Sequence, residues 1–418
     1  MRKWMFAAGG LLSLLALSAE PAAAQSIQAA SYAQFQQSVT GARAQDYIGH
    51  PGFKVQSAAA FEEMRGHLQQ MYSGVVTRGG YTQDNATFDC VTVASQPGAS
   101  GLRQIAAPPS LSPASAEGRS HLEPETLTGN AQHCSSGTIP LRRVTIDQLA
   151  RFRTLREFFH KSPFDAHVLR PDIAQPQHKY AFTYQYVTNY GGSSAISVYD
   201  PVIKTANDEV FSLTQHWYVG TVSNDDAATQ TAETGWQVFP EFYNTTKPVL
   251  FIYYTADDYN NTGCYNLTCK AFVQISNTWA LGGAMPHVST ATSVVQVQFG
   301  YYFHGGNWWL SIGNDWVGYY PATLYKGGQL SKAANLIEYG GETVGSTIWP
   351  PMGSGKFANA AGASYQHKIQ YRNGAGKLVK PSLTVDLPSP ACYTATVPAF
   401  SAKWLTYFNY GGPGGTKC

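Results

Sequence analysis

The stretch Thr231–Pro240 reads T-A-E-T-G-W-Q-V-F-P and has the pattern of a β-strand that carries one carboxylate, Glu233. Side chains in a strand alternate between two faces, so Gly235 and Gln237 share a face with Glu233, and Trp236 takes the other. A glycine inside a strand marks a place where another group comes close to the backbone. This strand therefore has room beside its acid for a neighbouring group.

A second acid in a similar setting, Glu342, lies far downstream in the run E-Y-G-G-E-T-V, where two glycines immediately precede it. When two carboxylates share a site, the ionised one takes a proton from water and the protonated one gives a proton to the substrate. Burial or mutual proximity keeps these two roles distinct. We hypothesise that Glu233 and Glu342 face each other across one cleft with a water molecule between them. A single glutamate is more often a solvated or structural acid, so the residue pattern alone leaves this pairing open.

The chain from about residue 179 onward reads as one short strand after another, separated by clusters of Gly, Asn and Asp. This pattern predicts an all-β fold, in which an antiparallel β-sandwich forms the catalytic domain. One helix is expected over Gly328–Glu338, which would leave Glu338 at a helix end and facing solvent. The expected strands are Tyr180–Tyr190, Ala195–Val202, Glu209–Val222, Glu233–Phe242, Val249–Thr255, Thr292–Tyr302, Trp308–Ile312, Trp316–Tyr320, His367–Arg372 and Ala391–Val397.

The composition favours a secreted β-protein. Aromatic residues make up 13% of the 418 residues, charged residues also make up 13%, and the net charge of +2 draws the chain neither to nucleic acid nor to a membrane surface. Arg2 and Lys3 precede an apolar run, and small residues up to Ala24 complete a secretory signal peptide over residues 1–24. The apolar run is too short to favour a membrane anchor. We expect a secreted monomer.

Secretion permits disulfides, and the chain has six cysteines, which allow 15 pairings in principle. Cys264 and Cys269 close the tight turn C-Y-N-L-T-C and are the natural pair. Chain order then suggests the pairs Cys90–Cys134 and Cys392–Cys418. The spacing C-x-x-C is absent from the sequence, so a zinc site is not expected.

The N-terminal part of the chain predicts a small α+β domain. Apolar residues at helical spacing predict a helix over Ala58–Met71, and Thr145 is placed to cap a helix over Ile146–Phe159. The polar segment His160–His178 then holds three prolines and reads as a linker. We therefore expect a signal peptide over 1–24, an N-terminal region over 25–176 and the sandwich over 177–418.

Several motifs in series resemble the neprosin family of glutamic prolyl endopeptidases. Within the sandwich they are T-A-E-T-G-W-Q-V-F-P, Y-T-A-D-D-Y, T-G-C-Y-N-L-T-C-K-A-F-V-Q, G-N-W-W-L, V-G-Y-Y-P and Y-G-G-E-T-V, followed by M-G-S-G-K-F. Upstream, F-D-C-V-T-V-A-S-Q-P-G and C-S-S-G-T-I-P-L-R-R resemble the pro-region of that family. The resemblance covers roughly residues 85–360.

The resemblance implies that Glu233 and Glu342 are the two catalytic glutamates. It also implies a β-sandwich fold, cleavage on the carboxyl side of proline in acid, a disulfide at Cys264–Cys269, and no metal or organic cofactor. Members are made as zymogens whose N-terminal part blocks the cleft, so residues 25–176 are expected to be an intramolecular inhibitor. Proline-containing peptides and proteins are the implied substrates.

In the implied mechanism one glutamate activates a water molecule and the other protonates the leaving amine. Gln237 is a candidate donor to the oxyanion, and its alternative role is a structural cross-strand hydrogen bond. Aromatic faces suit the flat ring of proline, although such residues also fill sandwich cores. The candidates for this pocket are Trp217, Tyr253, Trp308 and Trp309.

Two other functions fit the same residues. A glycoside hydrolase can use two carboxylates, and a lectin-like sandwich would keep the aromatic residues without needing both acids. The proline-bearing linker after a cysteine-linked N-terminal region favours a zymogen instead. In a zymogen, Pro171 and Pro176 mark where a proline-specific enzyme would cut itself free in acid.

Overall fold

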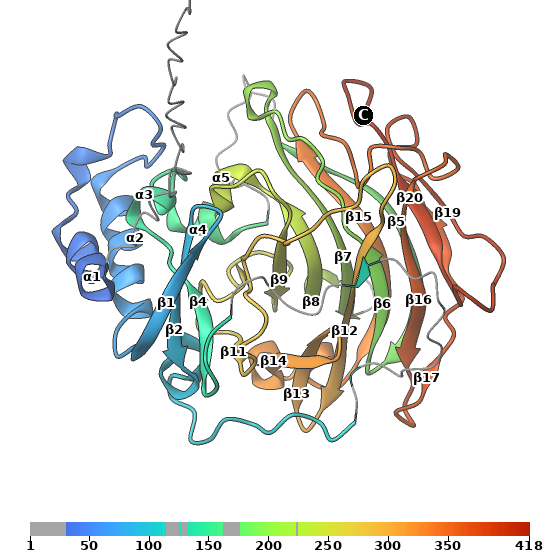
Figure 1. Ribbon diagram of the computed structural model, residues 1–418, viewed down its shortest axis with the longest axis horizontal. Helices are drawn as coiled ribbons and strands as arrows, with labels where there is room; N and C mark the ends of the chain where they lie inside the picture. The colour runs from blue at the N-terminus through green and yellow to red at the C-terminus, as the bar shows by residue number, and fades with distance from the viewer. Residues whose placement is uncertain (1–30, 112, 114–124, 127–132, 162–175, 223–224) are drawn as a thin grey trace, which may run out of the picture.

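Two antiparallel β-sheets form the body of the protein, and a smaller α+β region packs against one end of them (Figure 1). The computed structural model describes residues 31–111, 113, 125–126, 133–161, 176–222 and 225–418. The expected signal peptide and Pro171 lie outside the described residues. The all-β sandwich expected from the sequence is confirmed.

The first sheet has seven strands in the order β10-β9-β8-β7-β15-β5-β18, and we call it the site sheet because both glutamates lie on it. Its three central strands are long, and each pairs with an antiparallel neighbour on both sides. The strands are β5 (Gln177–Asn189), β7 (Glu209–Val222), β8 (Asp225–Val238), β9 (Val249–Thr255), β10 (Cys264–Tyr265), β15 (Ala334–Gly345) and β18 (Thr384–Asp386).

The second sheet has the order β11-β14-β13-β12-β6-β16-β20-β19, with β17 paired to β16 and β3 paired to β12. The parallel β3–β12 pair is the exception to its antiparallel pairing. The strands are β3 (Glu125–Thr126), β6 (Gly191–Ser197), β11 (Val273–Gln274), β12 (Val295–His304), β13 (Asn307–Ile312), β14 (Asp315–Pro321), β16 (Ser364–Arg372), β17 (Leu378–Val379), β19 (Thr394–Thr396) and β20 (Phe408–Gly411).

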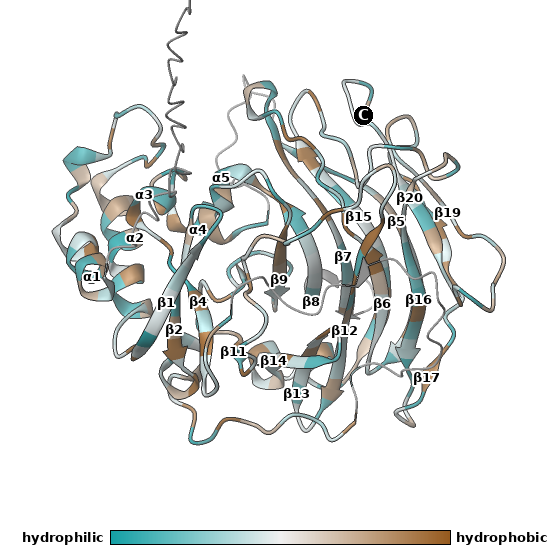
Figure 2. Cartoon of the chain, in the orientation of Figure 1, coloured by the Kyte–Doolittle hydropathy of each residue, from teal (hydrophilic) through white to brown (hydrophobic). Residues whose placement is uncertain are grey.

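The two sheets share an aromatic core, which fixes which face of each strand looks outward. Trp236 of β8 is fully buried, and its indole N–H donates to the Ser197 carbonyl of β6 at 3.0 Å. Tyr301 of β12 donates to the Glu233 carbonyl at 3.4 Å. The buried strand β9 is hydrophobic along much of its length (Figure 2). Because Trp236 points into the core, Glu233 points to the opposite face of β8, as the alternation predicted.

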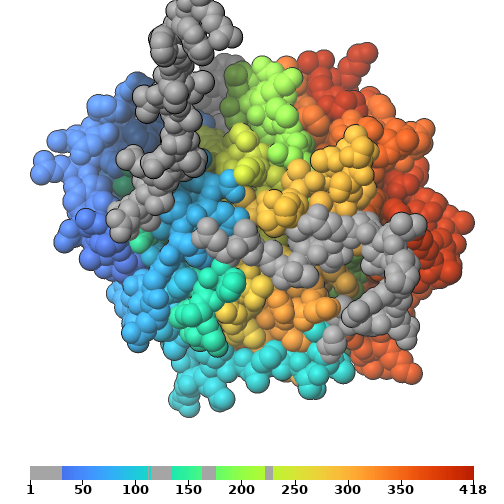
Figure 3. Space-filling view, viewed as in Figure 1, coloured from blue at the N-terminus to red at the C-terminus, as the bar shows by residue number. Residues whose placement is uncertain are grey.

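The N-terminal region contains four α-helices and a three-stranded sheet, β1-β2-β4. Its surface adjoins the sandwich without a gap in the space-filling view (Figure 3). Phe158 stacks on Phe242 with ring centroids 4.6 Å apart, and Gln96 exchanges hydrogen bonds with the backbone of Gln274 at 2.7 and 2.8 Å. The elements are α1 (Tyr32–Gly41), α2 (Ala58–Met71), β1 (Thr77–Gln83), β2 (Ala86–Thr92), β4 (Thr138–Arg142), α3 (Ile146–Leu149) and α4 (Leu155–Phe159).

Three disulfides join the expected cysteine pairs. Cys90–Cys134 connects β2 to the segment before β4 within the N-terminal region. Cys264–Cys269 closes the short turn that starts at β10, and Cys392–Cys418 joins the segment before β19 to Cys418. The three expected pairings are confirmed.

Two helix predictions need correction. The helix over Ala58–Met71 is present as predicted, but Ile146–Phe159 is divided into α3 and α4, because Thr154 starts a second helix by accepting from the Glu157 N–H. The stretch Gly328–Glu338 holds only the 3-10 turn Gln329–Ser331 and the start of β15. Glu338 therefore lies inside a strand.

Candidate active site

The strand register sets Glu233 and Glu342 diagonally across the site sheet. Glu233 on β8 pairs with Trp217 of β7, whereas Glu342 on β15 pairs with Leu213 of the same strand. The row between them holds Gln215 of β7, with Gly235 on one side and Gly340 on the other. Neither glycine contributes a side chain to the space between the two acids, although the backbone of β7 lies close to Gly235.

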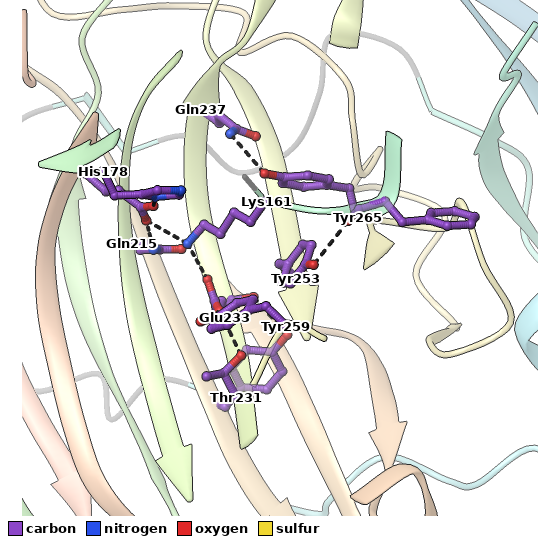
Figure 4. A network of polar contacts seen from close by, with 12 residues as sticks. Lys161, His178, Gln215, Thr231, Glu233, Gln237, Tyr253, Tyr259 and Tyr265 are labelled. Atoms are coloured by element: carbon purple, nitrogen blue, oxygen red, sulfur yellow. Dashed lines mark hydrogen bonds and ion pairs between the residues drawn. The ribbon is translucent and has the colours of Figure 1, made fainter. Parts of the chain in front are cut away.

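Lys161 fills this space. Its ammonium Nζ lies 2.6 Å from Glu233 Oε2 and 2.7 Å from Glu342 Oε2, so one cation bridges both carboxylates (Figure 4). All three side chains are at most 4% exposed. Lys161 lies two residues after the end of α4 and therefore belongs to the N-terminal region. The hypothesis that the two glutamates face one cleft is consistent with this geometry, although Lys161 lies where a water molecule was expected.

Glu233 has two hydroxyl donors on its other oxygen. Thr231 Oγ1 and the Tyr259 hydroxyl each donate to Oε1 at 2.7 Å. Thr231 precedes Glu233 by two residues and thus shares its face of β8. Tyr259 lies in the loop after β9 and stacks on Tyr253, with ring centroids 5.9 Å apart. The hydroxyls fix the orientation of this carboxyl group.

Glu342 has a different pair of donors. Gln215 Nε2 donates to Oε2 at 2.9 Å, and His178 Nδ1 lies 2.5 Å from Oε1. His178 is the second residue of β5, which pairs with β15. Glu233 thus has two neutral hydroxyl donors, whereas Glu342 has an amide and an imidazole. This difference gives the two acids separate chemical surroundings.

The bridge also sets the charge state of the site. Burial raises the pKa of Glu342, but Lys161 and His178 outweigh burial and lower the pKa to about 2. Burial lowers the pKa of Lys161, and the attraction of Glu233 and Glu342 more than reverses this. Glu342 is therefore ionised and Lys161 protonated in this form of the protein.

The aromatic candidates separate into two groups. Trp217 lies on the site sheet, where the Lys161 ammonium is 5.4 Å from the centre of its ring. Tyr253 is buried in the same sheet and donates to the Phe159 carbonyl at 3.1 Å. Trp308 and Trp309 both lie on β13 in the second sheet. Both are buried in the second sheet, which agrees with the alternative interpretation that they fill the sandwich core.

Gln237 lies in the same row of the sheet as Glu342, because both residues pair with Leu213 of β7. Its side-chain amide N–H donates to the Tyr265 hydroxyl at 3.5 Å, and its oxygen accepts from the Tyr243 hydroxyl at 3.4 Å. The side chain is fully buried. This arrangement matches the structural hydrogen bond that was the alternative to an oxyanion donor.

A small cavity of about 190 Å³ lies beside Glu233. Tyr180, Phe182 and Trp217 supply its aromatic walls. Thr231 and Tyr259, which both bond Glu233, line it as well, so the cavity borders the acid pair. Its remaining lining includes Val219, Thr229 and Glu338.

Sequence reasoning missed Lys161, His178, Gln215, Tyr259 and Thr231. Thr231 carried a usable signal, because it lies two residues before Glu233 in the same strand. The other four come from separate elements, and only the register of β5, β7 and β15 and the path of the chain after α4 bring them to the acids. The spacing of these residues along the sequence does not predict their contacts with the acids.

This β-sandwich presents two buried glutamates on one face, each with its own hydrogen-bond donors, and so defines an acid-pair site. Residues 208–413 match the family model described as Neprosin, and this range contains both glutamates. The sandwich therefore contains a Neprosin domain, and the chain is a glutamic peptidase.

Two solved structures are similar over about half of the chain. One is described as the crystal structure of scytalido-glutamic peptidase with a transition state analog inhibitor, with 7% identity, a TM-score of 0.30, and coverage of 57% of this chain and 100% of the other. The other is described as the crystal structure of Scytalido-glutamic peptidase with a peptide based transition state analog, with 7% identity, a TM-score of 0.31, and coverage of 56% of this chain and 97% of the other.

Among the described residues, no helix is both long and apolar enough to cross a membrane.

Proposed function

We propose that this chain is a secreted endopeptidase that cleaves on the carboxyl side of proline, and that the form described here is its latent zymogen. The observation that carries the proposal is the bridge from Lys161 to both glutamates. A substrate carbonyl and its attacking water need the same position between the acids. A chain with Lys161 in this position cannot hold them there.

The two roles of the acids follow from their partners. In the active form Lys161 has left, and His178 and Gln215 still favour the ionised form of Glu342. Glu342 then acts as the general base that takes a proton from water. Glu233, oriented by two hydroxyls, holds the shared proton and gives it to the leaving amine. Gln215 Oε1 has no hydrogen-bond partner among the described residues and is placed to accept from the attacking water.

The aromatic cavity beside Glu233 supports the preference for proline. Tyr180, Phe182 and Trp217 present flat faces on which the pyrrolidine ring packs. A volume of about 190 Å³ has room for one side chain. We therefore assign this cavity to the residue before the scissile bond.

Activation requires the chain to be cut after Lys161. Lys161 and His178 both contact Glu342. They flank the connecting segment, residues 162–177, which joins the N-terminal region to the sandwich. A cut after Pro171 or Pro176 would therefore separate these two parts. Acid would favour this cut by protonating the carboxylates that hold Lys161. Export through residues 1–24 is part of the same proposal.

Incubation of the full-length chain at acidic and neutral pH tests this function, with intact-mass measurement and a panel of peptides that contain or lack proline. We expect acid to shorten the chain by the N-terminal region, and the product to cleave after proline. Acid-treated protein that leaves all peptides intact but degrades a polysaccharide would replace the proposal with a glycoside hydrolase.

A further inference from the structure

Glu338 is a third acid on the same face of the site sheet. It lies four residues before Glu342 on β15 and pairs with Trp217, which in turn pairs with Glu233 on its other side. One row of the sheet therefore reads Glu338, Trp217, Glu233. Glu338 lines the aromatic cavity, and its carboxyl group makes no hydrogen bond or ion pair with any described residue.

The chemistry of this cavity depends on the charge of that carboxyl group. Aromatic faces attract a cation, and a carboxylate at the end of the same pocket supplies the opposite charge. Lys161, with its ammonium 5.4 Å from the Trp217 ring, shows that one of these aromatic faces already holds a cation. A protonated carboxyl group in the same place is neutral and leaves a pocket for an apolar ring.

We propose that Glu338 determines selectivity for the residue before the scissile bond, with the neutral acid admitting proline and the ionised acid admitting a lysine or arginine side chain. This inference rests on the proposed function, because it assumes that the cavity receives that residue. It adds a second substrate class to the enzyme and a residue that switches between the two.

The surroundings place this switch near neutral pH. Burial, then Glu233 and Asp386, raise the pKa of Glu338 to about 7, and Lys161 lowers it. When Lys161 leaves, the pKa of Glu338 is no longer lowered by that cation, so Glu338 stays neutral in acidic solution. The titratable or charged groups that face Glu338 or line its cavity are Glu233, Asp386, Lys161, Tyr180, Tyr184 and Tyr259.

The test uses two peptides that differ only in proline or arginine before the scissile bond. For the acid-processed enzyme, we expect the arginine-to-proline ratio of kcat/KM to rise about tenfold between pH 5 and pH 8. Glu338→Gln should hold this ratio flat, because glutamine does not titrate. Asp386→Asn should move the midpoint of the change to lower pH, because it removes a neighbouring negative charge.

A flat ratio in the wild type, or a rise that survives Glu338→Gln, would overturn the inference while leaving the proposed function standing. Binding of the two peptides to full-length Lys161→Met, Glu342→Gln protein gives the same ratio without turnover. If the wild type cleaves neither peptide, the proposed function fails. In that case a binding ratio that rises with pH still supports the role of Glu338, and a flat one overturns it.

Discussion

Lys161 and His178 contact opposite oxygens of the same carboxylate, that of Glu342, at 2.7 and 2.5 Å. Lys161 is the last described residue before the connecting segment, and His178 lies at the start of the first strand after it. One carboxylate therefore contacts a residue from each side of the connecting segment. In the proposed activation, His178 stays with the sandwich after the chain is cut, whereas Lys161 leaves with the N-terminal region.

Replacing Lys161 by Met should abolish latency. The uncut variant should cleave a proline peptide at least tenfold faster than the uncut wild type, because a Met side chain makes no ion pair that holds it between the acids. Loss of the central cation of a buried bridge should also lower the free energy of unfolding by about 3–5 kcal/mol. Activity assays on full-length protein and thermal unfolding measure both effects.

Lys54→Met is the matched control for that substitution. Lys54 also belongs to the N-terminal region and pairs with Glu241 of the sandwich, but its side chain is 58% exposed. This variant should stay latent and nearly as stable as the wild type. A Lys161→Met protein that is as latent as Lys54→Met would show that the lysine does not block the site.

Acid should weaken the fold of the full-length protein through Glu342. Its pKa is about 2 in the folded chain, below its ordinary value of 4.5. A carboxyl group with a lowered folded pKa contributes stability above its unfolded pKa, and this contribution is lost as the pH falls toward the folded value. We expect a loss of about 3 kcal/mol between roughly pH 4.5 and pH 2.

Chemical unfolding of full-length Glu233→Gln across this pH range measures the effect without self-cleavage. The double variant Glu233→Gln, Glu342→Gln serves as its control and should lose less stability over the same range. Equal losses in the two proteins would assign the acid sensitivity to other groups.

Replacing His178 by Asn should move the acid limb of the kcat/KM profile to higher pH. Without the imidazole, the pKa of Glu342 rises, so the base is protonated over more of the acidic range. His304→Asn, a change on β12 in the other sheet, should leave the profile unmoved. An unshifted limb in the His178 variant would argue against Glu342 as the base.

Replacing Tyr259 by Phe should reduce kcat about tenfold with little change in fold. The phenyl ring keeps its stacking on Tyr253, but Glu233 loses one of its two hydroxyl donors. Tyr254→Phe, on the neighbouring strand, is the control and should keep full activity. Equal activity in both variants would remove the Tyr259 hydroxyl from the chemistry.

Gly235→Ala should prevent the site sheet from forming properly. A Cβ atom at this position would lie 1.9 Å from the Thr214 carbonyl oxygen of β7, closer than any side chain tolerates. By contrast, Gly66→Ala in α2 meets no atom within 4 Å and should stabilise the protein by up to about 1 kcal/mol. Thermal unfolding of the two variants distinguishes a packing requirement from a general effect of glycine.

The sequence predicted the sandwich well, because alternation in strands such as β7 and β8 is a local signal. The same is true of the helix over Ala58–Met71 and of the turn between Cys264 and Cys269. The sequence also predicted that another group lies close to Gly235, and in the structure this group is the backbone of β7. The positions of the two glutamates came from their motifs.

What the sequence could not supply was the pairing of distant strands. Glu338 was expected at a solvent-facing helix end, because Gly328–Glu338 has no clear strand alternation. In the structure this stretch leads into β15, and the neighbours β7 and β5 bring Trp217 and the other aromatic residues to Glu338. The contact of Lys161 likewise depends on where the whole N-terminal region docks.

The most direct test of the two-glutamate site compares acid-processed wild type with Glu233→Gln and Glu342→Gln on a proline-containing peptide set. Gln keeps the shape of each side chain and removes its titratable proton. Each variant is treated with wild-type enzyme, which removes its N-terminal region before the assay. We predict that the wild type cleaves after proline and that both variants lose at least about a thousandfold in kcat/KM. Cleavage that persists in either processed variant would exclude that glutamate from the chemistry and contradict the account.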